Sequence, residues 1–408
     1  MNDLSHTARE KAKAILHATD AQIEHGLELH RQFLVCDSFG FNPRPNTAAM
    51  AEARNRLIEE GATADEVTAK LRDMEATELV ADPAAREEFV RVWREAGVDC
   101  IVHVVGRGSS LPVTLEHLAR FQYKCDMLAD ILVKAVTVED IRRARADGKL
   151  CLVWELNSPP VAGRMQDGRE ELRGLDLFHM LGVRVMHLTY NRRNLIGTGC
   201  TERNDGGLSE FGRDVIRRMN ELGILVDVPH SSRQTALDAA RVSERPIAAT
   251  HTCCRALYDH PRGRTDEEIK AIAEKGGVIG ILTIPTFIGE KGTLVSMLDQ
   301  IDHVARLVGV AHVAIGTDAG YACPAPGVAL RPMPKGSREN WWGNWRDVRV
   351  HEKGVSEENL TGSLAWTNWP FFTVGLVTRG YSDSDIEKIL SGNMLRVFGD
   401  VWTRPSSA

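Results

Sequence analysis

The feature that most constrains this chain is a series of eight short apolar runs, separated mostly by polar, helix-compatible segments. Apolar runs of this length are typical of buried strands, and strands that alternate with helices form parallel sheets. Eight such units are the number that closes a (β/α)8 barrel. The runs lie at residues 33–36, 100–105, 150–155, 183–190, 224–229, 246–250, 277–282 and 312–317.

An open, doubly wound sheet is the alternative fold with the same alternation of strands and helices. Polar residues stand at the ends of the runs all along the chain, and no glycine-rich dinucleotide turn follows the first run. Both observations favour the barrel, because the active sites of barrel enzymes lie at the strand ends. We therefore predict a single (β/α)8 TIM-type barrel domain over residues 1–408.

Structure is also predicted for several segments outside the eight runs. Residues 1–32 are predicted to form an N-terminal helix, residues 44–95 several helices, and residues 113–133 another helix. Residues 321–350 are rich in Gly, Pro and Trp and are predicted to be a long loop over the active face. In that loop, Trp341, Trp342 and Trp345 are interpreted either as a stacking wall over the substrate or as subunit contacts.

The composition excludes some partners. The net charge of −6 comes without a basic block, which argues against nucleic acid, and no apolar run approaches the roughly 18 residues of a membrane span. The charged N-terminus lacks the apolar core of a signal peptide. The eight cysteines have no CxxC spacing, and Cys253-Cys254 is interpreted as a reduced, packed pair. We expect a cytoplasmic protein without a membrane partner.

Polar side chains at the run ends predict where the chemistry lies. His230 and His251 end two consecutive runs, and Glu155, Tyr190 and Asp318 end or follow three others. A carboxylate and two imidazoles suit zinc, and a further aspartate is suited to act as a general base. Each residue also has a plainer interpretation as an ion pair, a helix cap or a packing residue, so the hypothesis depends on their shared position.

The same residues lie within longer motifs. The chain resembles the renal (membrane) dipeptidase family, a branch of the metal-dependent amidohydrolases built on a (β/α)8 barrel, over nearly its whole length. The motifs that carry the resemblance are Gly182-Val183-Arg184, Leu188-Thr189-Tyr190-Asn191, Gly207-Leu208-Ser209-Glu210-Phe211-Gly212, Asn220-Glu221-Leu222-Gly223, Asp259-His260-Pro261-Arg262, Gly276-Gly277-Val278-Ile279-Gly280, Gly316-Thr317-Asp318 and Gly392-Asn393-Met394-Leu395-Arg396-Val397.

The resemblance implies roles for five residues. Members of the family hold two zinc ions bridged by a glutamate, and Glu155 matches that glutamate. His230 and His251 match the two histidines of the second metal. Asp318 matches the aspartate that handles the catalytic proton, and Arg262 matches the arginine that grips the substrate's carboxylate, for which a guanidinium fork is well shaped. The resemblance also implies a homodimer.

The chain departs from the family at the first metal. Phe39 and Phe41 stand where relatives have a His-x-Asp pair, and neither ring can bind a metal, so we expect one zinc ion per chain and an apolar pocket floor. Tyr190 stands where relatives have an oxyanion-stabilising histidine. Asp37 and His103 are weaker candidates for a substitute ligand, whereas Cys36 and His187 are interpreted as packing residues.

Three functions fit these features. The first is a mononuclear zinc hydrolase that cleaves an amide or peptide bond next to a free carboxylate in a small molecule. The alternative is a non-hydrolytic enzyme of the tautomerase or lyase type, or a metal-free one, because the first metal site is degenerate and the remaining groups can transfer protons. A non-catalytic binding protein ranks last, because binding alone does not need the full polar set.

Overall fold

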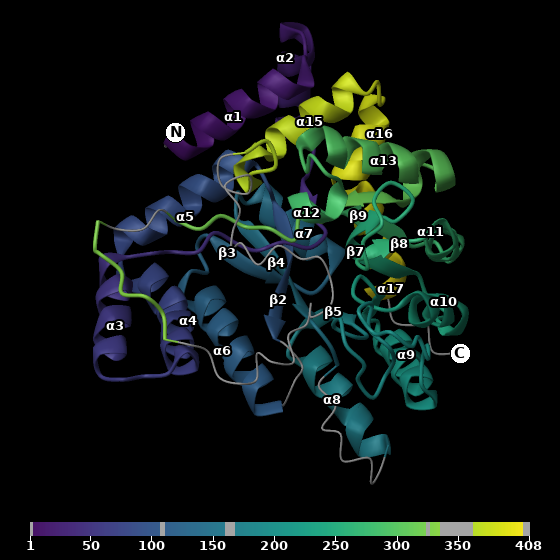
Figure 1. Cartoon of the computed structure of the whole chain (residues 1–408), viewed down its shortest axis with the longest axis horizontal. Helices are drawn as coiled ribbons and strands as arrows, with labels where there is room; N and C mark the ends of the chain where they lie inside the picture. Colours follow the sequence, from purple (N-terminus) through teal and green to yellow (C-terminus); the bar gives the residue numbers. More distant parts are fainter. Residues whose placement is uncertain (1–2, 107–110, 160–167, 324–326, 335–361, 403–408) are drawn as a thin grey trace.

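A barrel of parallel strands, surrounded by helices, forms the centre of the molecule (Figure 1). The computed structural model describes residues 3–106, 111–159, 168–323, 327–334 and 362–402. The strands run in the order β1-β2-β4-β5-β6-β7-β9-β10. Their bounds are β1 Cys36–Asp37, β2 Cys100–Gly106, β4 Leu150–Leu156, β5 Val183–His187, β6 Leu225–Asp227, β7 Ile247–Cys254, β9 Val278–Ile281 and β10 Val313–Ile315.

Backbone hydrogen bonds join the first and last strands of this order. The Ser38 amide donates to the Ile315 carbonyl over 2.9 Å, and the Asp318 amide donates to the Phe39 carbonyl over 2.9 Å. The sheet therefore closes on itself, and the predicted (β/α)8 barrel is confirmed, with one strand at or beside each of the eight apolar runs.

Two predictions of local structure are wrong. The helix expected over residues 113–133 is α6, Leu111–Met127, and is followed by a short strand, β3 (Leu132–Ala135), which pairs with the first half of β4. The single helix expected over residues 1–32 is two helices, α1 (Asp3–Leu16) and α2 (Asp20–Gln32). His17 has a positive φ of 49°, which ends α1, and the Thr19 hydroxyl accepts from the Gln22 amide, which starts α2.

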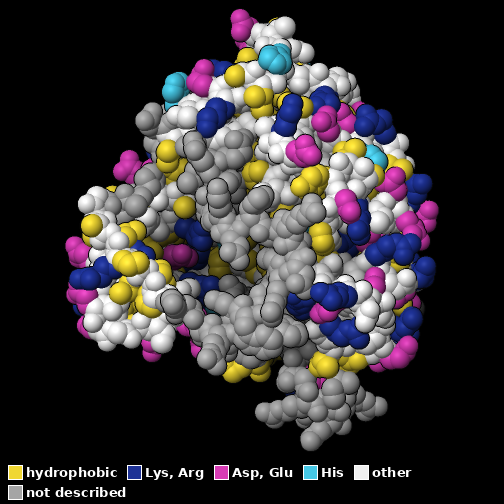
Figure 2. All heavy atoms as spheres, in the orientation of Figure 1, with side chains coloured by type: hydrophobic (Ala, Val, Ile, Leu, Met, Phe, Trp, Pro, Cys, Tyr) yellow, Lys and Arg dark blue, Asp and Glu magenta, His cyan; other side chains and the backbone are white. Residues whose placement is uncertain are grey.

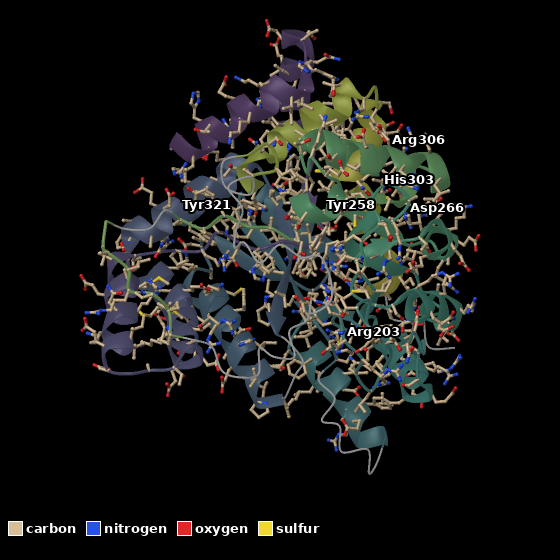
Figure 3. All side chains as sticks on the ribbon, in the orientation of Figure 1. Arg203, Tyr258, Asp266, His303, Arg306 and Tyr321 are labelled. Atoms are coloured by element: carbon tan, nitrogen blue, oxygen red, sulfur yellow. The ribbon has the colours of Figure 1, made fainter. Side chains whose placement is uncertain are left out.

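The other helices cover the barrel and extend from it. In Figure 1, α3, α4 and α5 form the predicted helical excursion at one side of the barrel, and α1 and α2 lie near α15 at its top. On another side, His303 of α13 contacts Asp266 of α11 at 2.8 Å (Figure 3). The bounds are α3 Ala48–Glu59, α4 Ala64–Ala81, α5 Pro83–Ala96, α7 Val138–Ala146, α8 Gly168–Met180, α9 Glu210–Leu222, α10 Arg233–Val242, α11 Asp266–Glu274, α12 Pro285–Ile288, α13 Leu294–Val308, α15 Trp369–Thr378, α16 Asp383–Glu387 and α17 Asn393–Trp402, with the two-residue strand β8 Gly263–Arg264 beside β7.

One end of the barrel interior is filled by apolar side chains. Met394, Val397 and Phe398 of α17 belong to this buried cluster. The strand residues in it come mainly from the first halves of the strands, so α17 closes the barrel where the strands begin. They are Cys36, Cys100, Val102, Cys151, Val153, Val185, Leu225, Ala248, Val278 and Ala314. The packing role predicted for Cys36 is confirmed.

Other predictions concern cysteines, membranes and the loop. All eight cysteines are free, including Cys253-Cys254. In the part of the chain that the structure describes, no helix has the length and apolarity to cross a membrane. Within the predicted loop, the Ala329 carbonyl accepts from the Asn55 side chain of α3 over 2.8 Å. The three loop tryptophans, Trp341, Trp342 and Trp345, lie outside the described residues, and so the roles predicted for them stay predictions.

His30 makes stability depend on pH. It is buried on α2, with Nδ1 2.8 Å from the Thr373 hydroxyl and Nε2 2.9 Å from the Ala96 carbonyl, and burial lowers its pKa to about 4. Below about pH 6.5 the unfolded chain binds a proton at this histidine that the folded chain refuses until about pH 4. As the pH is lowered from about 6.5 to about 4, we expect the free energy of unfolding to fall by about 1.4 kcal/mol per pH unit because of this histidine. Urea unfolding at several pH values measures this slope.

The variant His30→Gln is the control for this prediction. Glutamine does not titrate, so the slope of unfolding free energy against pH should be smaller than in the wild type by up to one proton's worth between pH 6.5 and 4. An identical slope in the two proteins would contradict the buried, neutral state of His30.

Candidate active site

The polar centre continues the inward-facing positions of the barrel strands. Side chains alternate along a strand, so the positions two residues beyond the apolar cluster face the same interior. On β4, β5 and β6 these positions are Glu155, His187 and Asp227, all fully buried. His187 Nε2 lies 3.3 Å from Glu155 Oε1 and 3.1 Å from Asp227 Oδ2.

The interpretation of His187 as a packing residue is therefore wrong. Its imidazole lies between two carboxylates at the centre of the barrel. A signal for this was present in the sequence, because His187 stands two residues after Val185 and Asp227 stands two residues after Leu225. The alternation marks these side chains as facing one interior, which only paired strands then bring together.

His230, three residues after β6, meets His251, which lies within β7. Their Nε2 atoms are 3.1 Å apart. His230 Nδ1 lies 2.6 Å from Asn191 Oδ1, an atom that only accepts hydrogen bonds, so Nδ1 carries the hydrogen. His251 Nδ1 lies 2.9 Å from the Thr250 hydroxyl, which donates its own hydrogen to Asp227 Oδ2, so this Nδ1 also donates.

Both imidazoles therefore present unprotonated Nε2 atoms to each other. Burial lowers the pKa of His230 and of His251 well below the usual value, and the nearby Arg262 charge lowers both further, so the rings are neutral. Two lone pairs facing each other repel unless a cation lies near both. Two nitrogens on one tetrahedral zinc, each about 2.0–2.1 Å from it, are about 3.3–3.4 Å apart, close to the distance seen here.

The buried carboxylates of Glu155 and Asp227 add candidate metal ligands to the histidines. Neither oxygen of Glu155 makes a hydrogen bond within the described residues. Burial raises the pKa of Glu155 well above its usual value, and the negative charge of Asp227 raises it further. A bound cation would relieve this buried carboxyl group. Among the described residues, the group of three ligands whose atoms all lie within 4.8 Å of one another is His187, Asp227 and His251, without Glu155 or His230. The residues fit a divalent metal ion, and the hydrogen-bonded Nδ1 atoms match the usual support of ligand histidines.

Asn191 is a residue that the sequence analysis missed. It has a positive φ of 57°, and its side chain orients His230. We expect Asn191→Ala to weaken metal affinity about 10- to 100-fold, because the hydrogen bond that holds the tautomer and the ring is lost. Titration with a competing chelator measures this affinity. Asn191→Asp keeps an oxygen acceptor and should retain more affinity than Asn191→Ala; equal losses in both variants would contradict the orienting role.

Asp318 follows β10 and lines the pocket next to this centre. Its φ is 50°, in the left-handed region that non-glycine residues rarely adopt, and such strain is frequent at functional sites. Burial raises its pKa to about 6, while the charge of Arg262 acts in the opposite direction. A carboxylate with such a pKa is suited to exchange protons near neutral pH.

Aromatic rings support the two histidines. Phe39 stacks on His251 with ring centroids 3.8 Å apart, and Tyr190, 36% exposed, stacks on His230 with centroids 4.1 Å apart. Phe41 meets Phe39 edge-to-face at 5.7 Å. The structure thus brings Tyr190, Phe39 and Phe41 to the site, where the two phenylalanines give the pocket floor its apolar character.

Arg262 is fully buried beneath the site rather than on the surface. Its Nη1 donates to the Pro229 carbonyl, and its Nη2 donates to the His251 carbonyl over 2.9 Å. The two ends of the guanidinium fork therefore hold the backbone next to His230 and His251. The role of Arg262 in gripping a substrate carboxylate stays a prediction.

The two weaker ligand candidates, Asp37 and His103, have other partners in the structure. Asp37 accepts hydrogen bonds from the Thr317 amide at 2.9 Å and hydroxyl at 2.6 Å and from Trp366 Nε1 at 3.2 Å, so its carboxylate is engaged. His103 Nδ1 lies 2.8 Å from the Val104 carbonyl, and its ring packs against Phe121 with centroids 4.7 Å apart. Both residues serve the structure around the site.

A pocket of about 570 Å³ opens from this centre. Phe39, Tyr190, His230 and Asp318 line its inner end, and it extends to side chains of α4 and α6. Figure 2 shows a hollow near the centre of this face, with basic and hydrophobic side chains close together in it. The polar centre is therefore open to small molecules.

Comparisons with known sequences bear on this site. The model of the membrane dipeptidase family (peptidase family M19) matches residues 85–329. An uncharacterised protein from the pqqA 5′ region of Klebsiella pneumoniae is 30% identical over 307 residues, which are 72% of this chain and 98% of that protein. Dipeptidase TcpJ of Claviceps purpurea is 26% identical over 298 residues, and the chain spans only 61% of that relative's length.

Solved structures share the fold. An amidohydrolase from Pseudomonas aeruginosa matches with a TM-score of 0.66 and 23% identity over 92% of this chain and 99% of that one. A metallo peptidase from Rhodobacter sphaeroides, liganded with a phosphinate mimic of the dipeptide L-Ala-D-Ala, matches with a TM-score of 0.61 and 19% identity over 80% of this chain and 97% of that one. At these identities the likeness shows the fold alone.

Fold and site together define a (β/α)8 barrel with histidines and carboxylates near the carboxyl ends of its strands. The chain belongs to the membrane dipeptidase family. The resemblance noted in the sequence motifs is thereby confirmed.

Proposed function

We propose that this protein is a zinc-dependent hydrolase with one ion per chain, which cleaves an amide or peptide bond next to a free carboxylate in a small substrate. The observation that carries the proposal is the pair of Nε2 atoms 3.1 Å apart, each on a ring whose Nδ1 is already used, in a pocket shared with Asp318. The dipeptidases among the relatives and the dipeptide mimic bound by the Rhodobacter enzyme support the choice of substrate bond.

The residues of the site would have different roles in this reaction. His230, His251 and Glu155 would hold the zinc, which supplies Lewis acidity and lowers the pKa of water when bound. Asp318 takes the proton of the attacking water and returns it to the leaving nitrogen. Tyr190, which lines the pocket, would donate a hydrogen bond to the developing oxyanion, and Phe39 and Phe41 would exclude water from the pocket floor.

A metal-free proton-transfer enzyme is the second candidate, and one observation favours it. His187 Nε2 lies within 3.3 Å of carboxylate oxygens of both Glu155 and Asp227. A hydrogen on that nitrogen could therefore interact with both carboxylates, and no metal ion would be needed between them. In that case Asp318 and Tyr190 would move protons for an isomerisation or elimination.

We also propose that the protein is cytoplasmic and forms a homodimer.

Metal content per chain, measured by elemental analysis on protein purified without chelator, tests the proposal. About one equivalent of zinc, together with hydrolysis of dipeptides, would support the mononuclear hydrolase. A folded protein with no metal and no hydrolysis would favour the metal-free candidate. Two equivalents would contradict the single-ion site and direct attention to His187 and Asp227 as additional ligands.

A further inference from the structure

Lys124 of α6 is a buried cation that lines the pocket away from the histidine pair. Its side chain is 6% exposed, and its Nζ lies 3.8 Å from the centroid of the Phe121 ring. It makes no hydrogen bond or ion pair with any of the described residues. A buried ammonium group without a counter-ion is costly, which points to a ligand that supplies the missing charge.

Three other basic side chains that line the pocket have partners of their own. Arg120 Nε is paired with Asp73 Oδ1 at 2.7 Å, and Arg72 Nη1 lies 3.5 Å from His117 Nε2. Arg193 Nη2 donates to the Asn204 carbonyl. Glu75 also lines the pocket and favours the charged lysine, but it forms no ion pair with Lys124. The local charge is therefore positive, and burial lowers the pKa of Lys124 to about 8, which keeps it mostly protonated at pH 7.

A row of rings connects the histidine pair to Lys124. Phe39 stacks on His251 at 3.8 Å, and Phe41 meets Phe39 at 5.7 Å. His103 continues the row, with its ring 5.7 Å from Phe41 and 4.7 Å from Phe121, over which Lys124 lies. His103 does not line the pocket, whereas the three phenylalanines of the row do, so a ligand there would meet their rings between the reacting centre and the ammonium group.

Arg262, the residue predicted to bind the substrate's carboxylate, is already engaged by the backbone. Both Nη atoms of Arg262 donate to backbone carbonyls, and Arg262 is not among the residues that line the pocket. We propose that Lys124 binds the free carboxylate of the substrate, and that the aromatic row from Phe39 to Phe121 binds an apolar or aromatic group between that carboxylate and the scissile bond. This inference rests on the proposed function. The substrates would be carboxylic acids that carry an apolar or aromatic group and an amide bond.

Binding of a matched pair of probes to the full-length protein as purified tests the inference. Hydrocinnamate carries a carboxylate on an aromatic body, and hydrocinnamyl alcohol is its neutral counterpart. By isothermal titration calorimetry we expect hydrocinnamate to bind about 10- to 100-fold more tightly, the range of one charge-assisted hydrogen bond. We expect Lys124→Met to abolish this preference and Lys124→Arg to restore part of it.

The control variant is Lys134→Met. Lys134 also lies over an aromatic ring, Trp154, at 4.1 Å, but its Nζ donates to Gln122 Oε1 and to the Leu181 carbonyl, and it does not line the pocket. It should keep the wild-type preference. No preference in the wild type, or an undiminished preference in folded Lys124→Met, would overturn the inference. Neither probe contains an amide bond, so the outcome is independent of whether the protein hydrolyses dipeptides.

Discussion

Replacement of Asp318 by asparagine is expected to lower kcat by about 10²- to 10⁴-fold, the usual contribution of a general acid–base group. Asparagine has nearly the same shape and tolerates the left-handed backbone conformation, with φ of 50°, that Asp318 adopts. The hydrogen bond that the backbone N–H of residue 318 donates to the Phe39 carbonyl does not involve the side chain and should persist. The variant therefore removes proton transfer without removing the fold, and steady-state kinetics on a dipeptide that the wild type cleaves measures the loss.

The pH profile separates this role from a structural one. The pKa of Asp318 is raised to about 6, so the fraction of the basic form falls as the pH drops through 6. We expect wild-type kcat/KM to decline below about pH 6 and the residual activity of Asp318→Asn to lack that limb. Metal content and circular dichroism of the variant should equal those of the wild type. Unchanged turnover in a folded, metal-loaded variant would eliminate Asp318 as the base.

Replacement of His251 by alanine is expected to weaken metal binding by more than about 100-fold, beyond the loss caused by removing a supporting residue. The variant deletes one of the two facing Nε2 atoms and leaves Phe39 without its stacking partner. His230→Ala should have a comparable effect, because each histidine supplies one side of the pair. Elemental analysis after dialysis, together with chelator competition, measures the change.

His103→Ala is the matched control for the histidine variants. His103 is also a buried histidine near the pocket, but its Nδ1 lies next to the Val104 carbonyl and its ring packs on Phe121. It should keep the metal content of the wild type. Full metal occupancy in both His230→Ala and His251→Ala would exclude the proposed site and leave metal-free proton transfer as the stronger candidate.

The sequence alone determined the barrel and the residues at its strand ends. Short apolar runs predict buried strands from local pattern, and the carboxyl ends of parallel strands meet at one rim, so His230, His251 and Asp318 are placed together without coordinates. That Phe39 and Phe41 stand where relatives have metal ligands is a prediction from the family resemblance, and it stays a prediction. The four-residue strand β3 escaped detection because it adjoins a helical segment and is too short for a clear period.

Only the tertiary structure decided how those side chains are used. The tautomers of His230 and His251 depend on Asn191 and on Thr250 with Asp227, and the first of these partners comes from a loop 39 residues away in sequence. The burial of Arg262 under two carbonyl groups depends on the path of the chain after β7. Likewise, the sequence gives no sign that Lys124 of α6 is buried, and its burial depends on the packing of α6 against α4 and β2. Hydrogen-bond partners and burial are set by long-range packing, and therefore local sequence patterns cannot specify them.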